Sequence, residues 1–498
     1  MFFWYFLISL PLLPIYLMFL ICLVIYKSII IAILKMRYGT NLITVDSIDS
    51  FFTLGTFQDN FSHILTTLRT DVKEENLMEK LIDALDGTFI KNADQLKKLH
   101  SSLKNFMGFP FLLKRKLEAA DFVTLIDVDR DGYESLNHLI HEYCTNPLHT
   151  NKKLLIDSTI LKCSNEWKIK NNFRIDQIPA LFKVHHVVGD GLSIMNLIVQ
   201  SFGDDKYVID KIIAEFNNRQ KPRNAWKRLL EDIVSFFLLP GFMVCEVIKR
   251  SLNSKVFVGG VGSGEQYFAK TVGDDNMSVQ KIKGLKNKIG DCGFTEILIT
   301  AISASLCDYF RKKGVEIPKT VAAFIVVVLE MQSLIKNGVP ILTNQFKFLP
   351  VEIPIEIGSD SMLKRLNDTK KYTRSPDLPV MFMMQRLFIN HIFGLFPRPI
   401  KKIFYRANYT SLTLSNIPGI HRITFLNGVE LDEVHFFIIN RKELGGIGFS
   451  ILTYADKLHL AFKAQDNMIS SQEDCQKIVD NVFNYINQLS LEICNKAI

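Results

Sequence analysis

Residues 178–202 read IPALFKVHHVVGDGLSIMNLIVQSF, a stretch in which two kinds of hydrophobic pattern meet. Ile178 to Val184 is short and mostly apolar, which is typical of a buried β-strand. Leu192 to Phe202 predicts a helix, because apolar residues recur along it at helical spacing. The segment HHVVGDG at 185–191 therefore lies where a buried strand ends and a helix begins.

The seven residues at this junction carry the side chains of an acid–base site. A neutral imidazole from His185 or His186 can take a proton from an alcohol that attacks a carbonyl carbon. Asp190 is a short carboxylate that can hold the turn through an ion pair or through backbone hydrogen bonds. Gly189 and Gly191 permit backbone dihedrals that other residues disfavour. Because histidine pairs at strand ends are more often structural, the spacing alone leaves both interpretations open.

Two further segments in the second half of the chain accompany this motif. They read SNIPG at 415–419 and GGIGFSILTYADKL at 445–458. In order and spacing, the three segments resemble the wax ester synthase/diacylglycerol acyltransferase family. This family belongs to the CoA-dependent acyltransferase superfamily, whose signature is His-His-x-x-x-Asp-Gly. The resemblance extends from about Asp83 to the C-terminus.

The resemblance implies an α/β fold in which two chloramphenicol-acetyltransferase-like domains face each other across a tunnel. Acyl-CoA and the acyl acceptor would approach from opposite sides. His186 matches the second histidine of the family's motif and would be the general base, so that the alcohol attacks the thioester directly. His185 would shape the pocket, and Asp190 would have a structural role beside Gly191.

The chain departs from the family's pattern at two places that bear on the substrate pocket. Where the family has an Asn-Asp pair opening a helix of the second domain, this chain has Thr295-Glu296. Thr295 is one candidate to donate a hydrogen bond to the tetrahedral oxyanion, and Asn416 is a second candidate. The family's Pro-Leu-Trp segment corresponds here to Pro147-Leu148-His149, which loses an aromatic ring from the acceptor side.

Length and composition limit the remaining classes. The chain has 498 residues, of which 48% are hydrophobic and 22% charged, so it can form two or three cores and is not intrinsically disordered. Eight cysteines spread over this length exclude a small disulfide scaffold. The net charge of +8 suits contact with phosphate or anionic lipid. Without a zinc finger or a dense arginine tract, it does not indicate nucleic-acid binding.

The N-terminal segment is apolar enough to enter lipid. Phe2 to Tyr26 contains no charged side chain and exceeds the roughly 20 residues that cross a hydrocarbon core. The basic start and small-residue cleavage site of a signal peptide are missing, so residues 1–37 predict a retained anchor. Pro11 and Pro14 are expected to kink this anchor or to turn part of it into a re-entrant hairpin.

Positive charges after this span indicate its orientation. Lys27, Lys35 and Arg37 place the C-terminal flank in the cytosol by the positive-inside rule. The sequence therefore predicts a single-pass or hairpin anchor in the endoplasmic reticulum, or in the plasma membrane, with a cytosolic catalytic body. The cysteines show no paired spacing, which fits reduced thiols.

The rest of the chain divides into two α/β parts of similar size. Residues 45–220 predict an N-terminal domain that carries the histidine motif, and residues 265–498 predict a C-terminal domain. A crossover linker over 221–264 joins them. Its Gly-rich end at 258–264 lacks a following Gly-Lys-Ser/Thr, so a flexible connector is expected rather than a phosphate-binding loop.

Two apolar stretches inside the body are ambiguous. Ile233 to Val247 lies within the predicted linker, and Leu378 to Phe396 lies in the predicted C-terminal domain, where basic residues follow it. Each suits a helix in the membrane interface with basic residues at the headgroups. Each equally suits a core helix, and the sequence leaves these interpretations open.

Two patterns imitate metal sites. DVDRDG at 127–132 copies the first half of a calcium loop, but His138 stands where the loop requires a bidentate glutamate. His138, His141 and Cys144 recur on one face of a predicted helix without a fourth ligand in view. No metal and no cofactor is therefore predicted, and acyl-CoA is expected only as a co-substrate.

The motif and the N-terminal span together predict a membrane-anchored O-acyltransferase that moves a long-chain acyl group from acyl-CoA to a lipid alcohol. A fatty alcohol would give a wax ester and a diacylglycerol would give a triacylglycerol, and the sequence does not separate these acceptors. The alternative is a catalytically inactive lipid-binding or lipid-transfer protein that keeps the tunnel. His186 and Asp190 favour the enzyme, whereas Thr295-Glu296 favours the alternative.

Overall fold

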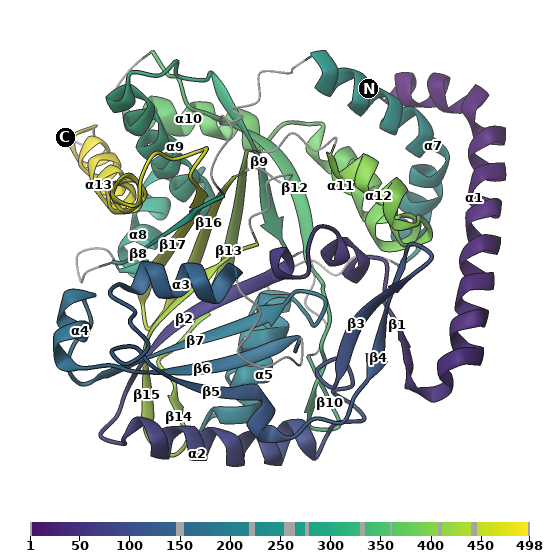
Figure 1. Cartoon of the computed structure of the whole chain (residues 1–498). Coiled ribbons are helices and arrows are strands. Elements are labelled where there is room, and N and C mark those ends of the chain that lie inside the picture. Colours follow the sequence, from purple (N-terminus) through teal and green to yellow (C-terminus); the bar gives the residue numbers. More distant parts are fainter. Residues whose placement is uncertain are drawn as a thin grey trace.

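The computed structural model describes residues 2–145, 154–218, 225–252, 264–273, 278–328, 334–358, 361–406, 411–439 and 446–496. Pro147-Leu148-His149 and all but the last residue of the Gly-rich stretch 258–264 lie outside the described residues. In the part of the chain that is described, two six-stranded sheets meet near the middle of the molecule, and helices pack against them (Figure 1). The predicted two-part α/β architecture is therefore confirmed.

The first sheet is built around the strand that leads into the histidine motif. Its strands, in spatial order, are β14 (Thr424–Phe425), β15 (Val429–Phe437), β2 (Phe61–Arg69), β7 (Gln177–His185), β6 (Ile156–Lys162) and β5 (Val123–Asp127). β7 is buried along its whole length and pairs antiparallel with β2 and β6. The predicted strand is thus a central one, and the predicted helix follows it as α5 (Gly191–Phe202).

The second sheet holds the other segments of the resemblance. Its strands, in spatial order, are β12 (Lys347–Pro354), β9 (Thr320–Val327), β13 (Leu412–Ile420), β16 (Ile447–Tyr454), β17 (Lys457–Gln465) and β8 (Gln266–Val272). β16 and β17 form an antiparallel hairpin whose turn residues Ala455 and Asp456 have positive φ, as a tight turn requires. Helices α9 (Phe294–Lys313) and α13 (Gln472–Lys496) share one apolar core with this sheet.

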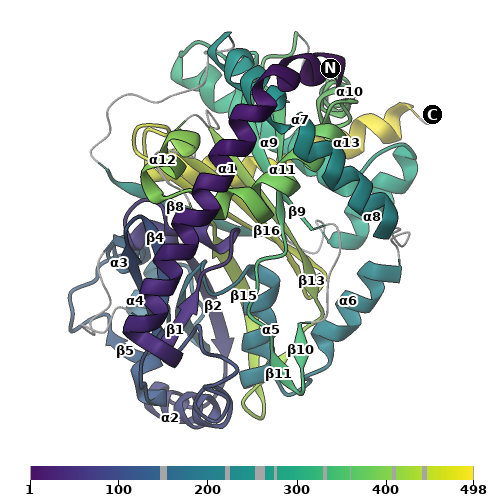
Figure 2. The same cartoon turned by 90° about the vertical axis from the view of Figure 1, so that its right-hand side faces the viewer.

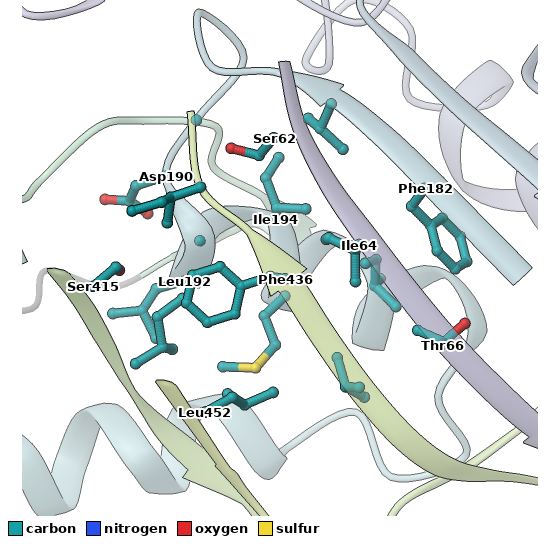
Figure 3. A pocket seen from close by; sticks show the side chains of 18 of the residues that line it. Ser62, Ile64, Thr66, Phe182, Asp190, Leu192, Ile194, Ser415, Phe436 and Leu452 are labelled. Atoms are coloured by element: carbon teal, nitrogen blue, oxygen red, sulfur yellow. The ribbon is translucent and has the colours of Figure 1, made fainter. Parts of the chain in front are cut away.

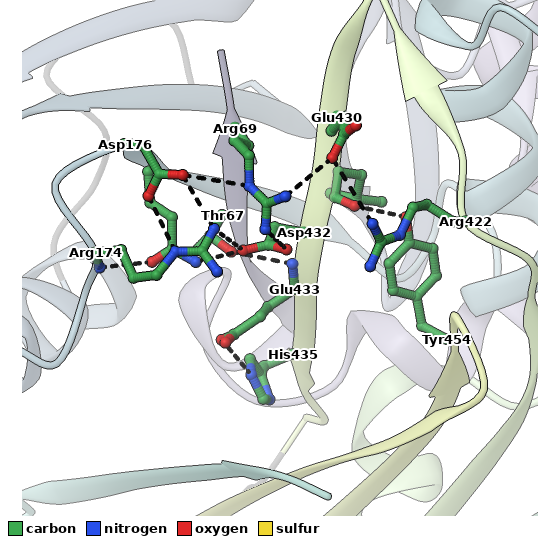
Figure 4. A network of polar contacts seen from close by, with 12 residues as sticks. Thr67, Arg69, Arg174, Asp176, Arg422, Glu430, Asp432, Glu433, His435 and Tyr454 are labelled. Atoms are coloured by element: carbon green, nitrogen blue, oxygen red, sulfur yellow. Dashed lines mark hydrogen bonds and ion pairs between the residues drawn. The ribbon is translucent and has the colours of Figure 1, made fainter. Parts of the chain in front are cut away.

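The two sheets do not divide at one point in the sequence, because β14 and β15 come from the second half of the chain and complete the first sheet. β15 pairs antiparallel with β2, and its register shifts at Asp432. The Asp432 carboxylate accepts hydrogen bonds from Arg69 (2.8 Å) and Arg174 (3.1 Å), while Arg69 also contacts Glu430 (Figure 4). This network holds the crossing strand to the N-terminal half.

Smaller elements surround the sheets. β1 (Leu42–Thr44), β4 (Phe109–Lys114) and β3 (Ser101–Phe106) form a small sheet, and β10 (Ile335–Lys336) pairs with β11 (Val339–Pro340). The other short helices are α2 (Glu74–Leu85), α3 (Leu136–Thr145), α4 (Asn165–Lys170), α6 (Val208–Asn218), α8 (Val279–Ile289), α10 (Met362–Thr373), α11 (Leu378–Leu387) and α12 (Arg398–Arg406). α2 and α5 contribute to the apolar core of the first sheet.

The N-terminal segment is one continuous helix, α1 (Phe2–Tyr38), which is long and apolar enough to cross a membrane. It bends near its N-terminal end, where Pro11 and Pro14 remove backbone hydrogen bonds (Figure 1). The predicted kink is therefore present. The predicted alternative of a re-entrant hairpin is wrong, because the helix does not turn back on itself.

The predicted linker 221–264 contains a long helix, α7 (Ala225–Leu252). Pro240 lies inside this helix, and Gly241 is packed so closely that a Cβ there would lie 2.1 Å from the carbonyl oxygen of Tyr5 in α1. α7 thus runs against α1 on one side of the molecule (Figure 2). Its described part is thus a helix that packs on the N-terminal helix, whereas all but the last residue of the stretch expected to be a flexible connector, 258–264, lies outside the described residues.

The second ambiguous stretch, 378–396, forms α11 followed by two short helical turns, η7 (Phe388–Ile392) and η8 (Phe393–Leu395). This segment is also long and apolar enough to cross a membrane by composition. Met384 and Phe393 are nevertheless buried in an apolar cluster that includes residues of α1, α7, β9 and β12. This packing favours the core-helix interpretation for most of the segment.

Candidate active site

The candidate site forms where segments from distant parts of the sequence converge on the turn after β7. The His186 N–H donates to the carbonyl of Asn60 (2.9 Å), which tethers the turn to the start of β2. The Asp190 N–H donates to the carbonyl of Thr343 (3.1 Å), which tethers it to the loop before β12. A short helical turn, η2 (Asp49–Thr53), packs against the same turn through Phe52.

Asp190 fastens the two halves of the chain together at this point. Its buried carboxylate caps α5 by accepting from the Ser193 N–H (3.0 Å), and it also accepts from the Gln345 N–H (2.8 Å). Burial raises the pKa of Asp190, while these backbone hydrogen bonds act in the opposite direction. The side chain therefore fixes the loop 343–345 beside the histidine motif through backbone hydrogen bonds.

The His186 ring is clamped between aromatic side chains. It stacks on Phe52 with ring centroids 3.9 Å apart, and it meets Phe346 edge to face at 5.4 Å. Its Nδ1 lies 3.0 Å from the Oδ1 of Asn344. These contacts fix the ring plane and engage Nδ1.

The hydrogen bonds of Asn344 determine where the proton of the His186 ring resides. The amide nitrogen of Asn344 donates to Asp49 Oδ1 (2.7 Å) and to the carbonyl oxygen of His186 (2.9 Å). The amide oxygen therefore faces Nδ1, and an amide oxygen can only accept. Nδ1 must then carry the hydrogen, which leaves the lone pair of the neutral ring on Nε2.

Asp49 in turn fixes the orientation of the Asn344 amide. Its carboxylate is buried and accepts from Lys98 Nζ at 2.6 Å as well as from Asn344. Burial raises the pKa of Asp49, and the Lys98 charge and both hydrogen bonds oppose that change. We refer to Lys98, Asp49 and Asn344 as the orienting chain. It links three residues that no local pattern in the sequence connects.

His185 lies on the other side of the first sheet from the cavity that His186 borders. Its buried ring packs against Phe57 and Phe61, and its Nδ1 accepts from the Val187 N–H (3.2 Å). Strand alternation explains this, because Phe182 and Val184 line the cavity while His185 belongs to the opposite face of β7. Its contact with the turn residue Val187 supports a role in holding the motif in place.

A cavity of about 200 Å³ extends from His186 between the two sheets. Figure 3 shows Ile64, Thr66 and Phe182 toward one end of it and Asp190 and Ser415 toward the other. A second group of lining side chains, on β9 and β12, is aromatic or branched aliphatic and includes Phe324, Val326 and Phe348. Nearly all of the lining is apolar, so the space beside His186 suits hydrocarbon chains.

β13 carries the second-half residues to this cavity. Ser415, Asn416 and Ile417 line it, and the strand register shifts directly after Ile417. Gly191, which also lines the cavity, lies close to this strand, because a Cβ there would lie 2.5 Å from Cδ1 of Ile417 and would displace the end of that side chain. The glycine of the motif thus allows the start of α5 to approach β13.

The two predicted oxyanion donors contact each other, but only one of them borders the cavity. The Asn416 amide nitrogen lies 3.3 Å from the Thr295 hydroxyl, to which it donates. An amide nitrogen carries two N–H bonds, so this contact leaves a second one for a ligand. Thr295 is not among the cavity-lining residues. The arrangement favours Asn416 as the group that meets a substrate oxygen and Thr295 as its partner.

Glu296 does not line the cavity and forms an ion pair with Arg374. It accepts from the Gly293 N–H just before α9 (2.6 Å) and from Arg374 Nε and Nη2 (2.7 Å each). Although burial raises the pKa of Glu296, the hydrogen bonds from Arg374 and its neighbours outweigh it and the pKa is lowered. The residue therefore caps α9 as a carboxylate.

Among the described residues, no group of three or more histidine, cysteine, aspartate or glutamate side chains is arranged to hold a metal ion. His138, His141 and Cys144 all lie on α3. The polar groups that line the cavity include the imidazole of His186 and the amide of Asn416, which suit proton transfer and hydrogen bonding to an oxygen.

Comparison with known proteins tests the family resemblance. Residues 342–490 match the family model described as WS/DGAT C-terminal domain. No curated protein sequence matches the chain significantly. The family resemblance inferred from the motifs is therefore confirmed, on a match that covers the part of the chain containing Asn344 and Asn416.

Solved structures share the fold over nearly the whole chain. A wax ester synthase/diacylglycerol acyltransferase from Marinobacter aquaeolei VT8 matches with a TM-score of 0.55 and 12% identity, covering 91% of this chain and 100% of that one. The trichothecene 15-O-acetyltransferase TRI3 from Fusarium sporotrichioides matches with a TM-score of 0.58 and 11% identity, over 90% and 95%. The epimerization domain of tyrocidine synthetase B matches at 0.52 and 13%, over 92% and 98%. The chain has the two-domain chloramphenicol-acetyltransferase-like fold of these proteins.

Replacing Asp190 tests whether it fastens the two halves. In Asp190→Asn, one carboxylate oxygen is replaced by an NH₂ group, which cannot accept a hydrogen bond. The side chain can then no longer accept from both Ser193 and Gln345, so the unfolding free energy should fall by about 1–3 kcal/mol. Amide hydrogen exchange at Gln345 should accelerate. The matched control is Asp204→Asn, since Asp204 also accepts from two backbone N–H groups but at an exposed turn. Unchanged exchange at Gln345 would contradict the assigned role.

Proposed function

We propose that this chain, whose residues 342–490 match the WS/DGAT C-terminal domain, is an O-acyltransferase that transfers a long-chain acyl group from acyl-CoA to a lipid alcohol. The observation that carries the proposal is the ring of His186, which borders an apolar cavity with its Nδ1 hydrogen-bonded to Asn344. The lone pair on Nε2 is what a general base requires.

The reaction we propose needs no covalent enzyme intermediate. Nε2 of His186 takes the hydroxyl proton of the alcohol while the alcohol oxygen attacks the thioester carbonyl carbon of acyl-CoA. The resulting tetrahedral oxyanion collapses, the carbon–sulfur bond breaks, and the imidazolium returns its proton to the CoA thiolate. Holding both substrates in line supplies much of the rate advantage, because a bimolecular step becomes effectively unimolecular.

Asn416 is proposed to stabilise the tetrahedral oxyanion, with Thr295 holding its amide. Asn416 borders the same cavity as His186, and its amide nitrogen already donates to the Thr295 hydroxyl. A donor fixed in advance toward the developing charge costs no reorganisation during the reaction. This support does not depend on the Asn-Asp pair that the chain lacks at 295–296.

The apolar lining supports lipid substrates on both sides of His186. The acyl chain and the acceptor chain can each occupy a hydrocarbon-lined space, one beside β2 and β7 and the other beside β9 and β12. Fatty alcohols and diacylglycerols both present a hydroxyl group on an apolar body. We therefore propose both wax ester and triacylglycerol as products within reach of this site.

A lipid acceptor requires access to a membrane, and α1 supports this. We propose that the helix holds the enzyme at a bilayer and that the catalytic body is cytosolic, at the endoplasmic reticulum or the plasma membrane. Acyl-CoA would then arrive from the cytosol and the alcohol from the bilayer.

The alternative is an inactive lipid-binding or lipid-transfer protein with the same cavity. This alternative is supported by the departure at Thr295-Glu296, because Glu296 accepts hydrogen bonds from Arg374 and Gly293 and does not reach the site. It leaves the orienting chain unexplained, because a protein that only binds lipid has no need to fix a proton on one nitrogen of His186.

The assay that separates these functions measures neutral lipid formed by the purified full chain. Labelled palmitoyl-CoA is supplied with hexadecanol, with diacylglycerol and with shorter alcohols. Product should form, and His186→Ala should lower the rate by at least about 100-fold because a general base is removed. The control His421→Ala changes an exposed histidine outside the cavity and should keep the rate. A folded His186→Ala variant with full activity would contradict the proposed mechanism.

Asn344→Ala tests the orienting chain separately from the base. Loss of the Nδ1 acceptor should lower kcat on the order of 10- to 100-fold, the range seen for residues that orient histidine ligands, with KM nearly unchanged. Asn344→Asp should move the acidic limb of the pH–rate profile to higher pH, because a carboxylate beside the ring favours the imidazolium.

Asn196→Ala is the matched control for this pair, because Asn196 is a buried asparagine outside the cavity lining whose amide nitrogen donates to the Leu334 carbonyl (2.8 Å). It should lower stability and leave the pH profile in place. If Asn344→Asp leaves the acidic limb unmoved, Asn344 does not act through His186.

A further inference from the structure

The face of α1 that points away from the protein is apolar along most of the helix. From Phe3 to Ile33, its exposed positions carry no charged side chain. The buried positions are separated by three, four, seven or eleven residues, which is helical spacing, and form a narrow stripe that includes Tyr5, Ser9, Leu20 and Leu23. One side of the helix therefore packs on the body, and the rest requires an apolar neighbour.

α1 contacts the body along its whole length. Near its N-terminus, Tyr5 packs edge to face on Phe242 of α7, and the Ser9 hydroxyl accepts from the Gly241 N–H (2.8 Å). Near its C-terminal end, Tyr26 packs on Phe109 with ring centroids 5.7 Å apart. The helix has 37 residues, so it is about 55 Å long, whereas a hydrocarbon core is about 30 Å thick. If α1 crossed a bilayer in this structure, α7 and the β3–β4 hairpin would have to enter the bilayer with it.

α7 extends the same apolar surface. All of its exposed positions from Leu229 to Ile248 are apolar. The helix is fastened to the body from the other side, because Arg386 of α11 pairs with Asp232 (2.7 Å) and Glu231 (3.4 Å) of α7. Figures 1 and 2 show α1 and α7 side by side at the edge of the molecule. We refer to the outward faces of these two helices as the α1–α7 surface.

The composition of this surface decides between a lipid and a protein neighbour. Interfaces between protein copies are only about 56–65% apolar and carry polar rims and hydrogen bonds. The outward face of α1 between Phe3 and Ile33 offers no charge and little hydrogen bonding. Basic residues are exposed at the ends of the surface, at Lys35, Arg37 and Lys227. An apolar face with cations at its margin matches a bilayer with anionic headgroups.

We propose that the α1–α7 surface is a membrane-binding platform that lies along one leaflet of the bilayer, so that α1 does not cross it. Both ends of α1 then lie on the same side of the membrane as the catalytic body. This differs from the single-pass anchor that the sequence predicts. The proposal concerns how the protein sits on lipid, and its tests do not depend on catalysis.

An apolar cluster beneath the platform continues to the candidate active site. Leu20 and Leu23 of α1, with Leu238 and Phe242 of α7, belong to the same cluster as Phe52, whose ring stacks on His186. Apolar packing therefore extends without a break from the platform to the aromatic ring that stacks on the base. This continuity is a further reason for assigning the surface to a bilayer.

Protease protection tests whether α1 lies along the membrane. The full chain, carrying one epitope tag at each terminus, is inserted into sealed microsomes and treated with protease from outside. The platform predicts that both tags are lost without detergent. An N-terminal tag that is protected until detergent is added would overturn the proposal, because α1 would then cross the bilayer.

The three native tryptophans test the contribution of α7. Trp4 on α1 and Trp226 on α7 are 62% and 77% exposed, whereas Trp167 in the body is 5% exposed. In phosphatidylcholine/phosphatidylserine vesicles with brominated acyl chains, Trp4 and Trp226 should be quenched and Trp167 should not. Trp4→Phe and Trp226→Phe variants assign the signals. Unquenched Trp226, whether α7 then faces water or a second copy of the chain, would overturn the platform.

Discussion

The orientation of one amide group is the constraint on which the rest of the site depends. Asn344 donates both of its N–H bonds, to Asp49 and to the His186 carbonyl, so only its oxygen can face the imidazole. A reversed amide would turn its oxygen toward the Asp49 carboxylate and the His186 carbonyl, so that acceptors would face acceptors, which is strongly unfavourable. The proton of the ring is thereby assigned to Nδ1. The chemistry proposed for Nε2 follows from that assignment.

The same interaction requires the two halves of the chain to be held in register. Asn344 belongs to the loop before β12 in the second half, whereas His186 follows β7 in the first. Asp190 fixes that loop by accepting from Gln345, and the arginine network around Asp432 fixes the crossing strand β15. Asp190 therefore acts indirectly, by keeping Asn344 within hydrogen-bond distance of the His186 ring.

Local pattern was sufficient to predict β7, α5 and the β16–β17 hairpin, because each has a clear hydrophobic period or turn. The resemblance of the short motifs then predicted the fold. In the structure, His186, Gly191 and Asn416 from these motifs line one cavity. The orienting chain could not be predicted, since Lys98, Asp49 and Asn344 are far apart in sequence and lie in no motif. His185 lies on the face of β7 opposite to the cavity, as strand alternation requires. The resemblance alone had implied that it shapes the pocket.

The membrane-facing helices show a related limit. Hydropathy identified α1, but a uniformly apolar helix carries no sequence signal for which face packs on protein. Its partner α7 lies within the predicted linker, and its packing on Tyr5 and Ser9 could not be predicted, because it depends on Gly241, some 230 residues away. Apolar packing thus connects the platform to the cavity, and hydrogen bonds of the orienting chain hold His186 at the cavity.

The central claim concerns the proton on the His186 ring, and nitrogen NMR measures it directly. The full chain is labelled with ¹⁵N-histidine, and the His186 signals are assigned by their loss in His186→Gln. At a pH where the ring is neutral, the account predicts a protonated Nδ1 and an unprotonated Nε2. A neutral ring protonated at Nε2, or an equal mixture of both forms, would contradict it.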